Sequence, residues 1–248
     1  EMSKQVMPDG SMIEGAPGYQ NCVIYGTSRQ LAFCARYGIA LPETTLANIR
    51  RMVAFAVALQ KPNGCSPMFG DSQDEDAAGY LHCMRAFFPD DPALAWTTTR
   101  GQDGTPPAYT SVACRHIGYY ALRSGWEPDA RYLIFDGGRF GQAHQHEDML
   151  NFELFAYGRP FLVDAGVRSY EDHWFRTWSV LSQAHNTLDI DGVGQCRWRQ
   201  DRTRWFSAAP LEHRFDTGET WDVVEATFDG PYEREIGPIV QRRRIVFH

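Results

Sequence analysis

The chain has 248 residues, of which 43% are hydrophobic and 22% are charged, and its formal net charge is −7. This length and balance indicate a globular protein with a sizeable core, in one large domain or two smaller ones, and exclude a disordered chain. The negative charge argues against a nucleic-acid partner, which needs a basic surface, and no apolar run approaches the roughly 18–20 residues of a membrane span.

Residues 1–108 predict a helical part with connections rich in Gly and Pro. Apolar residues recur there at intervals of three and four, for example Leu46, Ile49 and Val53, which is the spacing of one helix face. We expect helices to be confined to about residues 1–100. The predicted helices cover residues 21–37, 42–59 and 77–88.

An acidic loop separates the second and third of these helices. Its acidic members are Asp71, Asp74, Glu75 and Asp76. We interpret the loop as solvated, with one residue capping the following helix, and we assign no chemistry to it.

Residues 109–248 predict an antiparallel β-sandwich. The composition changes near Pro106 and Pro107, which block a continuing helix. Many short runs with turn signals such as Asp136-Gly137 then follow, as in an antiparallel sandwich. The predicted strands cover residues 119–123, 131–135, 150–157, 160–163, 187–190, 204–208, 223–228 and 239–247.

The stretch from Ala143 to Gly166 carries two histidines close to a strand-like run. If a strand begins at His144, then His146 and Asp148 point to the same side as the apolar residues that follow, because side chains in a strand alternate. Buried ionisable groups need partners or a metal.

Three ligand-type residues come from separate segments of the predicted sheet. Two imidazoles and one carboxylate, from His146, Asp164 and His185, predict a Zn²⁺ site with an open position, and Mn²⁺ or iron could use the same set. If one of these three residues is not a ligand, His144 and His173 are the next candidates for a metal ligand. The alternative for each histidine is a hydrogen-bonded core residue. A cupin is disfavoured, because its Glu and its second His motif are missing.

Two further features carry weaker signals. A basic run interleaved with tryptophans spans 197–205 and is either a solvated strand face or a site for an acidic ligand; its members are Arg197, Trp198, Arg199, Arg202, Arg204 and Trp205. The six cysteines are scattered and are interpreted mainly as buried apolar residues, while a disulfide between some of them stays open.

Several motifs together resemble the heparinase II/III-like polysaccharide lyases. In the second half they are the run 117–126, Asp129-Ala130, the run 135–138, AHQHED at 143–148, Gly158-Arg-Pro160, Asp164-Ala-Gly166, Tyr170 and Ala184-His-Asn-Thr-Leu188. In the first half they are Asp9-Gly10, the segment 14–19, Asn63-Gly64 and Gly70-Asp71.

The resemblance implies a fold and an activity. Members pair an α/α toroid with a C-terminal β-sandwich, so residues 1–108 would be the C-terminal part of the toroid in a fragment of a longer protein, and the sandwich could itself be truncated. The activity implied is β-elimination at C4–C5 of a uronate in an acidic polysaccharide, of alginate or glycosaminoglycan type. A secreted or periplasmic bacterial enzyme is implied as well, and the oligomeric state stays open.

The resemblance also implies roles for individual residues. Tyr19 would be the catalytic acid, and base where geometry allows, while His144 would be the other base or would orient substrate. His146, Asp164 and His185 would hold zinc as a brace for the site. No residue matches the family's Asn or His that neutralises the substrate carboxylate, and Gln20 stands where many relatives carry His.

Two other functions remain open from the sequence. One is a carbohydrate-binding sandwich without catalysis, which would not need a proton-transfer pair such as Tyr19 and His144. The other is a cupin-like metal oxygenase.

Overall fold

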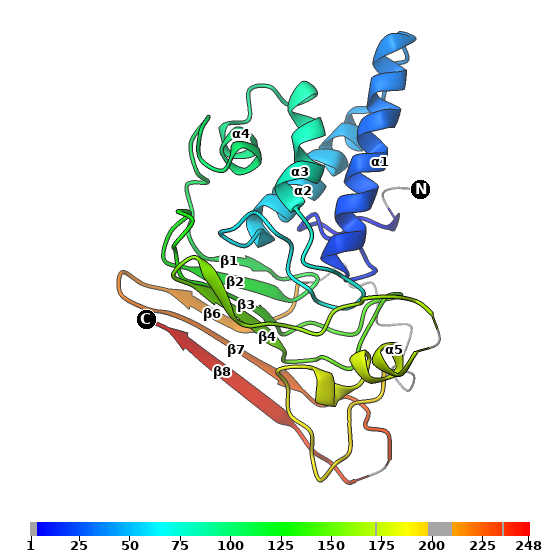
Figure 1. Ribbon diagram of the computed structural model, residues 1–248, viewed down its shortest axis with the longest axis vertical. Coiled ribbons are helices and arrows are strands. Elements are labelled where there is room, and N and C mark those ends of the chain that lie inside the picture. The colour runs from blue at the N-terminus through cyan, green and yellow to red at the C-terminus, as the bar shows by residue number, and fades with distance from the viewer. Residues whose placement is uncertain (1–3, 172, 198–209, 235) are drawn as a thin grey trace.

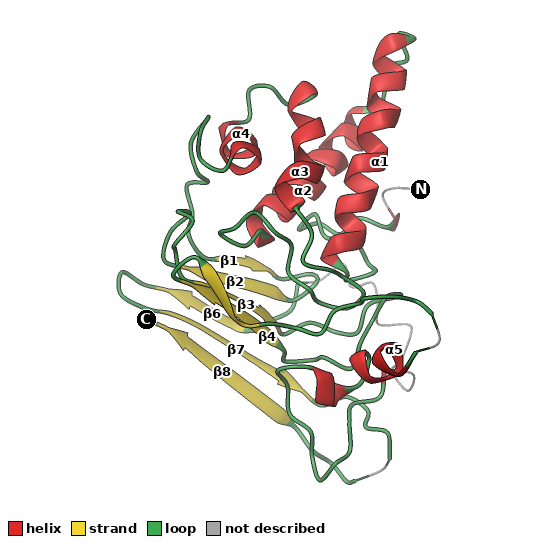
Figure 2. Cartoon of the chain, in the orientation of Figure 1, coloured by secondary structure: helices red, strands yellow, loops and turns green. Residues whose placement is uncertain are grey.

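The structure is a computed structural model that describes residues 4–171, 173–197, 210–234 and 236–248. Helices come first along the chain and antiparallel strands follow (Figures 1 and 2), which confirms the predicted fold class. The helices of the first half are α1 (Pro17–Arg36), α2 (Glu43–Leu59), α3 (Ala77–His82), the 3₁₀ turn η2 (Cys83–Ala86) and α4 (Pro92–Thr99).

The strands form two antiparallel sheets. The five-stranded sheet has the order β1 (Val112–Cys114), β2 (Tyr119–Arg123), β3 (Tyr132–Asp136), β4 (Phe152–Ala156) and β5 (Arg159–Leu162). The three-stranded sheet has the order β6 (Arg214–Thr217), β7 (Asp222–Phe228) and β8 (Gln241–Phe247).

The helices and the two sheets make three layers, with the five-stranded sheet in the middle (Figure 1). One core joins helical residues such as Phe55 and Leu59 to the sheet residues Tyr132 and Ile134. Another core joins the other face of this sheet to the three-stranded sheet, and a third lies within the helices. Because both of its faces are covered, every residue of β2 and of β3 is buried, and neither strand shows polar alternation.

Hydrogen bonds fasten the end of α2 to the middle sheet. The Tyr132 hydroxyl donates to the carbonyl of Leu59 at 2.6 Å. The buried Arg123 guanidinium donates to the carbonyls of Ala58 and Gln60 at 2.8 and 3.1 Å. These bonds satisfy carbonyls that have no partner within the helix, so two strand residues fix the direction in which α2 leaves the sheet.

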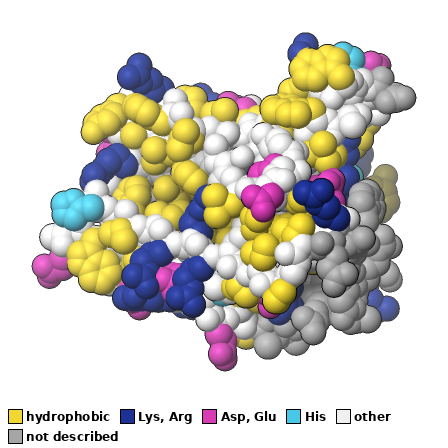
Figure 3. All heavy atoms as spheres, turned by 90° about the horizontal axis from the view of Figure 1, so that it is seen from below, with side chains coloured by type: hydrophobic (Ala, Val, Ile, Leu, Met, Phe, Trp, Pro, Cys, Tyr) yellow, Lys and Arg dark blue, Asp and Glu magenta, His cyan; other side chains and the backbone are white. Residues whose placement is uncertain are grey.

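The three-stranded sheet has a polar outer face. Arg214, Glu225 and Arg244 are register partners across its strands, and Arg244 pairs with Glu225. Figure 3 shows this side of the molecule from below, where basic and acidic side chains lie among hydrophobic ones. Exposed pairs of this kind contribute only about 0–1 kcal/mol each, so this face adds little to stability.

Several elements differ from the sequence-based prediction. Helices are not confined to the first half, because α5 (Trp174–Ser179) and the 3₁₀ turn η3 (Ser182–Ala184) follow β5. The predicted strand at 187–190 is wrong, since only a single bridge forms there, from Ile190 to Val193. The strand predicted at 204–208 lies outside the described residues.

Other details of the chain bear on the predictions. Strands β1 and β6 and helix α4 are additional to the predicted elements. All six cysteines are free, and only Cys114 is buried, so the interpretation of the cysteines as mainly buried is wrong. Among the described residues, no helix is both long enough and apolar enough to span a membrane.

Candidate active site

The AHQHED segment lies in a loop and not in a strand. His144 has a φ of 58° and Leu150 a φ of 64°, and these left-handed conformations interrupt an extended chain. β4 begins only at Phe152. The condition under which His144, His146 and Asp148 would share the side of the following core residues, a strand that begins at His144, is therefore not met. The loop turns each of these side chains independently.

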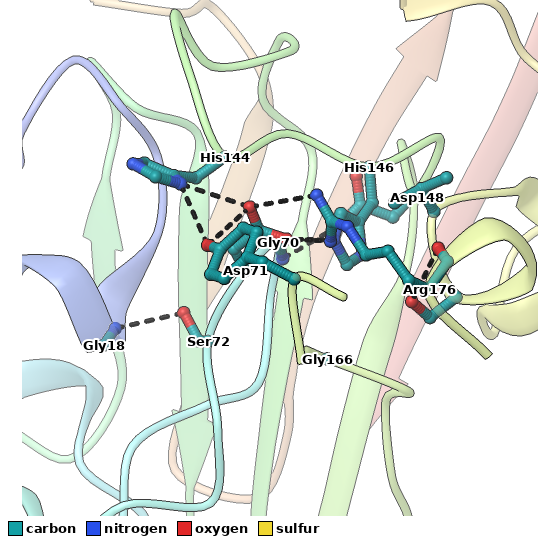
Figure 4. A network of polar contacts seen from close by, with 12 residues as sticks. Gly18, Gly70, Asp71, Ser72, His144, His146, Asp148, Gly166 and Arg176 are labelled. Atoms are coloured by element: carbon teal, nitrogen blue, oxygen red, sulfur yellow. Dashed lines mark hydrogen bonds and ion pairs between the residues drawn. The ribbon is translucent and has the colours of Figure 1, made fainter. Parts of the chain in front are cut away.

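Tyr19 is placed by the start of α1. Pro17 stands in the first turn of this helix, where its missing N–H costs nothing. The Gly18 N–H donates to the Ser72 hydroxyl at 3.0 Å (Figure 4). The loop after α2 thus supplies a partner to the start of α1, and this contact fixes the position of Tyr19 in the first turn.

Two tyrosines and a histidine from three segments meet beside this helix start. The rings of Tyr19 and His144 stack with their centroids 3.6 Å apart and their planes 16° apart. The Tyr19 and Tyr170 hydroxyls are 2.6 Å apart, and the Tyr170 hydroxyl lies 3.3 Å from His144 Nδ1. Tyr19 and His144 are half-buried, so this group is reachable from solvent.

Asp71 lies behind this group, and the interpretation of its loop as solvated is wrong at this residue. Asp71 is 4% exposed. His144 Nδ1 lies 3.1 Å from its Oδ2, and the Tyr170 hydroxyl donates to the same oxygen at 2.9 Å. His146 Nε2 lies 2.9 Å from Oδ1. Of the other loop members, Asp76 does cap α3 by accepting the Gly79 N–H.

The backbone brings Asp71 to the histidine loop through Gly70. Gly70 has a φ of +58°, and a Cβ there would lie 2.4 Å from the carbonyl oxygen of His144. The Asp71 N–H donates to that carbonyl at 2.9 Å, and the Gly70 N–H donates to Asp148 Oδ2 at 3.4 Å. Only glycine allows both this conformation and this approach.

Arg176 from α5 completes the surroundings of Asp71. Its guanidinium donates to both carboxylate oxygens, through Nη1 to Oδ1 and through Nη2 to Oδ2 at 3.3 Å (Figure 4). Burial alone would raise the pKa of Asp71, but the hydrogen bonds and charges of His146 and Arg176 hold this pKa well below its usual range. Asp71 is therefore an ionised carboxylate that only accepts hydrogen bonds.

The pKa of Tyr170 moves in the opposite direction. Burial raises it, and the hydrogen bonds to Tyr19 and Asp71 raise it further. The Tyr170 hydroxyl therefore keeps its proton and donates it to Asp71. Since that hydroxyl still has free lone pairs, it accepts the hydroxyl hydrogen of Tyr19.

The structure brings His146, Asp164 and His185 together, as a group that we call the His-Asp-His cluster. One potential ligand atom from each lies within 4.8 Å of the others. All three residues are buried, and His146 is 0% exposed. The Asp164 carboxylate is held by the Asn151 amide at 2.6 Å and by the Gly166 N–H at 2.8 Å.

Two ring nitrogens of the His-Asp-His cluster have no hydrogen-bond partner among the described residues, although they are buried. They are His146 Nδ1 and His185 Nε2. An unsatisfied buried polar atom is costly, and a divalent cation would satisfy both. The residues therefore fit a metal ion that prefers N and O ligands.

Electrostatic coupling within the cluster is strong. His185 Nδ1 lies 2.7 Å from Asp164 Oδ2. Burial opposes charge on both groups, but the contact raises the pKa of His185 and lowers that of Asp164. His173, considered as a replacement ligand, instead caps α5 by accepting the Phe175 N–H, and it is exposed.

Gln20 and Arg197 have structural contacts outside this site. The Gln20 side chain accepts the Met12 N–H at 3.0 Å and donates to the carbonyls of Gly10 and Met52. Arg197 donates to Glu147 at 3.1 Å. The remaining members of the basic run, Trp198, Arg199, Arg202, Arg204 and Trp205, lie outside the described residues.

Sequence reasoning missed Asp71 and Arg176 as parts of the site. Arg176 sits on a helix that the prediction lacked. Asp71 carried one usable signal, the Gly70-Asp71 pair within the family resemblance, but the surrounding acidic residues made it look like a solvated loop.

Comparison with known proteins agrees with this architecture. A family model described as "Heparinase II/III N-terminus" matches residues 1–96. A heparin-sulfate lyase of Pedobacter heparinus is 28% identical over 92% of this chain and 34% of its own length. One from Bacteroides stercoris is 26% identical over 77% of this chain and 30% of its own length. The chain thus spans about a third of these relatives.

Solved structures give the same picture. A heparan sulfate lyase of Pedobacter heparinus has a TM-score of 0.77 and 25% identity, covering 99% of this chain and 38% of that one. A heparinase III has a TM-score of 0.83 at 20% identity, over 100% of this chain and 37% of that one, which shows the shared fold. Because the model described as "Heparinase II/III-like, C-terminal" matches residues 106–248, more than half of the chain, the chain belongs to the heparinase II/III-like family.

Proposed function

We propose that this chain carries part of the active site of a polysaccharide lyase that cleaves a uronate-containing glycosaminoglycan by β-elimination. The observation that carries the proposal is the contact of Tyr19, His144 and Tyr170 beside the His-Asp-His cluster. The names of the relatives, heparin-sulfate lyases, favour a sulfated glycosaminoglycan over alginate. We also propose a secreted or periplasmic bacterial enzyme, as the family resemblance implies.

The chemistry requires two proton transfers on one sugar ring. A base removes the hydrogen at C5, the electron pair forms the C4–C5 double bond, and the C4–O bond breaks as an acid protonates the leaving oxygen. Tyr19 can act as the acid, and as the base where the sugar presents both atoms to it. His144, stacked on Tyr19, can act as the other base or orient the substrate.

Tyr170 supports this assignment of Tyr19. Its hydroxyl, which donates to Asp71 and accepts from Tyr19, can hold the Tyr19 hydrogen in a fixed direction until transfer. Catalytic groups held by locked neighbours lose less entropy on reaching the transition state.

The His-Asp-His cluster would hold the metal, for which we propose Zn²⁺, with Mn²⁺ or another divalent cation as the alternative. Such an ion supplies positive charge and ties three segments together. His146 and His185 belong to the loops on either side of β4 and β5, so the cluster acts as a brace. We also propose a domain boundary at residue 108, between the helical part (1–108) and the β-sandwich (109–248).

The test is Tyr19→Phe in the full-length protein, with heparan sulfate, heparin, hyaluronan and alginate as substrates and the ultraviolet absorbance of the unsaturated product as the readout. We expect turnover to fall at least about 10²-fold, the low end for a positioned general acid or base, while the fold is kept. His144→Ala should cost a similar factor. The matched control is Tyr37→Phe, an exposed tyrosine at the far end of α1.

Two outcomes would contradict the proposal. Full activity in Tyr19→Phe would show that another residue transfers the proton. Binding of the polysaccharide by the wild-type protein without any unsaturated product would favour the non-catalytic carbohydrate-binding module.

A further inference from the structure

Four side chains surround the Asp71 carboxylate, those of His144, His146, Tyr170 and Arg176. The carboxylate therefore faces both a proposed catalytic histidine and a proposed metal ligand. Oδ2 faces His144 Nδ1 at 3.1 Å, and Oδ1 faces His146 Nε2 at 2.9 Å. These two histidines are two residues apart in the chain and have different surroundings, with side chains 24% and 0% exposed respectively.

We infer that Asp71 is a positioning residue that sets the tautomers of His144 and His146 at once. The inference deepens the proposed function and rests on it for the role of His144. In a neutral imidazole one nitrogen carries hydrogen and the other accepts, and the hydrogen bond made by one nitrogen decides the state of the other.

The geometry assigns each tautomer. An ionised carboxylate only accepts, so the nitrogen that faces it carries the hydrogen. His144 then has its hydrogen on Nδ1 and a free lone pair on Nε2, which is the state that a base needs. His146 has its hydrogen on Nε2 and a free lone pair on Nδ1, the buried atom that lacks a partner and that a metal would need.

The surrounding donors keep Asp71 in this role. Arg176 donates to both oxygens, and Tyr170 donates to Oδ2, so Asp71 stays ionised and cannot rotate freely. Arg176 Nη1 also lies 3.4 Å from His146 Nε2, but this contact is longer than the 2.9 Å approach of the carboxylate. The carboxylate contact therefore decides which nitrogen carries the hydrogen.

The two histidines are therefore linked through one side chain. A carboxylate that orients a metal-bound histidine is a common outer partner of metal sites, and its loss typically costs about 10–100-fold in metal affinity or activity. Here the second oxygen of the same carboxylate orients the base. Replacing Asp71 by Asn gives one accepting and one donating end, so at least one histidine must face a donor and change its tautomer or turn away.

The first measurement needs no variant. Nitrogen-15 NMR of the metal-free wild-type protein at about pH 8, above the usual histidine pKa of about 6.5, reports which nitrogen of each ring carries hydrogen. We expect hydrogen on Nδ1 of His144 and on Nε2 of His146, assigned with His144→Gln and His146→Gln. The opposite tautomer in either ring would overturn the inference, whether or not the protein has lyase activity.

The second measurement is Asp71→Asn with Asp76→Asn as the control. Asp76 lies in the same loop, its side chain is 56% exposed, and Asn caps a helix about as well as Asp. Asp71→Asn should change the tautomer of at least one histidine and lower Zn²⁺ affinity or kcat at least about 10-fold, with KM less affected. Asp76→Asn should change neither tautomer nor Zn²⁺ affinity.

The outcomes separate this inference from the proposed function. Unchanged tautomers together with unchanged Zn²⁺ affinity in Asp71→Asn would overturn the role of Asp71. A wild-type protein without lyase activity, but with the expected tautomers and with Zn²⁺ affinity lost in Asp71→Asn, would overturn the proposed function while supporting the positioning role.

Discussion

Lys61→Met should weaken the packing between the helical part and the five-stranded sheet. Lys61 follows α2, and its ammonium lies 3.3 Å from the Glu153 carboxylate on β4, with these two side chains only 4% and 3% exposed. It also lies 2.7 Å from Asp74. The same Glu153 carboxylate accepts the Met68 N–H, in the loop that leads to Asp71. Met keeps the length of the lysine stem but removes its charge.

The magnitude follows from the burial of the pair. At the 3.3 Å separation and an effective dielectric constant of about 20, the attraction is about 5 kcal/mol. Removing one partner of a buried pair costs about 3–5 kcal/mol, because the other charge stays uncompensated. We therefore expect the free energy of unfolding of Lys61→Met to fall by about 3–5 kcal/mol at a pH where Glu153 is ionised in both folded proteins, and by less at a pH where the variant protonates Glu153 instead.

The pH dependence has a definite sign. Burial raises the pKa of Glu153 to about 7, even though Lys61 lowers it. Burial alone would lower the pKa of Lys61, but the carboxylates of Glu153 and Asp74 stabilise its charged form and raise this pKa above its usual value. Glu153 thus has a folded pKa above its unfolded value of about 4.3, so its contribution to stability is fully present below that value and is lost as the pH rises through 7. Without Lys61 the folded pKa rises further.

The assay is urea unfolding at about pH 5 and pH 8.5, on either side of the Glu153 pKa of about 7. The deficit of Lys61→Met relative to wild type should be small at the lower pH, where Glu153 is protonated in both proteins. It should reach about 2 kcal/mol at pH 8.5, because it grows by about 1.4 kcal/mol for each pH unit above the wild-type Glu153 pKa of about 7 until the higher pKa of the variant is reached. The double variant Lys61→Met/Glu153→Gln should lose most of this pH dependence. A deficit that is equal at the two pH values, or that is absent at the higher one, would refute the reasoning.

Two further predictions concern the site itself. Gly70→Ala and Gly38→Ala both place a Cβ on a residue with positive φ. At Gly70 this Cβ would lie 2.4 Å from the His144 carbonyl oxygen, whereas nothing lies within 4 Å of it at Gly38. In urea unfolding, Gly38→Ala should lower the free energy of unfolding by about 1–2 kcal/mol, and Gly70→Ala should lower it clearly more and abolish turnover. Removing metal with a chelator should lower the melting temperature, and adding Zn²⁺ should restore it; a melting temperature insensitive to both would leave the His-Asp-His cluster as a polar core.

The order of helices and strands could be predicted from the sequence because it depends on local patterns. The spacing of Leu46, Ile49 and Val53 is visible without any tertiary information, and α2 (Glu43–Leu59) begins and ends within a residue of the prediction. α4 was missed because its eight residues are too few for a periodic pattern. The strand predicted at 187–190 failed because its apolar residues pack without a partner strand beyond one bridge.

The proposed metal ligands were accessible to sequence reasoning in a way that Asp71 was not. His146, Asp164 and His185 are of the residue types that a metal requires, and they lie near the ends of predicted strands, so residue type and position together indicate them. Tyr19 needed the family resemblance, because a tyrosine at the start of a helix has no local mark of chemistry. Its contact with His144 joins positions 19 and 144, which only the packed layers bring together.

Asp71 could not be distinguished by residue type, because Asp74, Glu75 and Asp76 surround it with the same chemistry. The difference lies in the backbone: Gly70 in its left-handed conformation turns Asp71 inward, with its N–H on the His144 carbonyl. Asp74 and Asp76, beyond that turn, keep side chains that are 51% and 56% exposed. The turn at Gly70 thus stands between a buried carboxylate with four partners and two carboxylates that are about half exposed. Asp71 therefore depends on Gly70, because a loop that loses this glycine no longer places the Asp71 carboxylate beside either histidine.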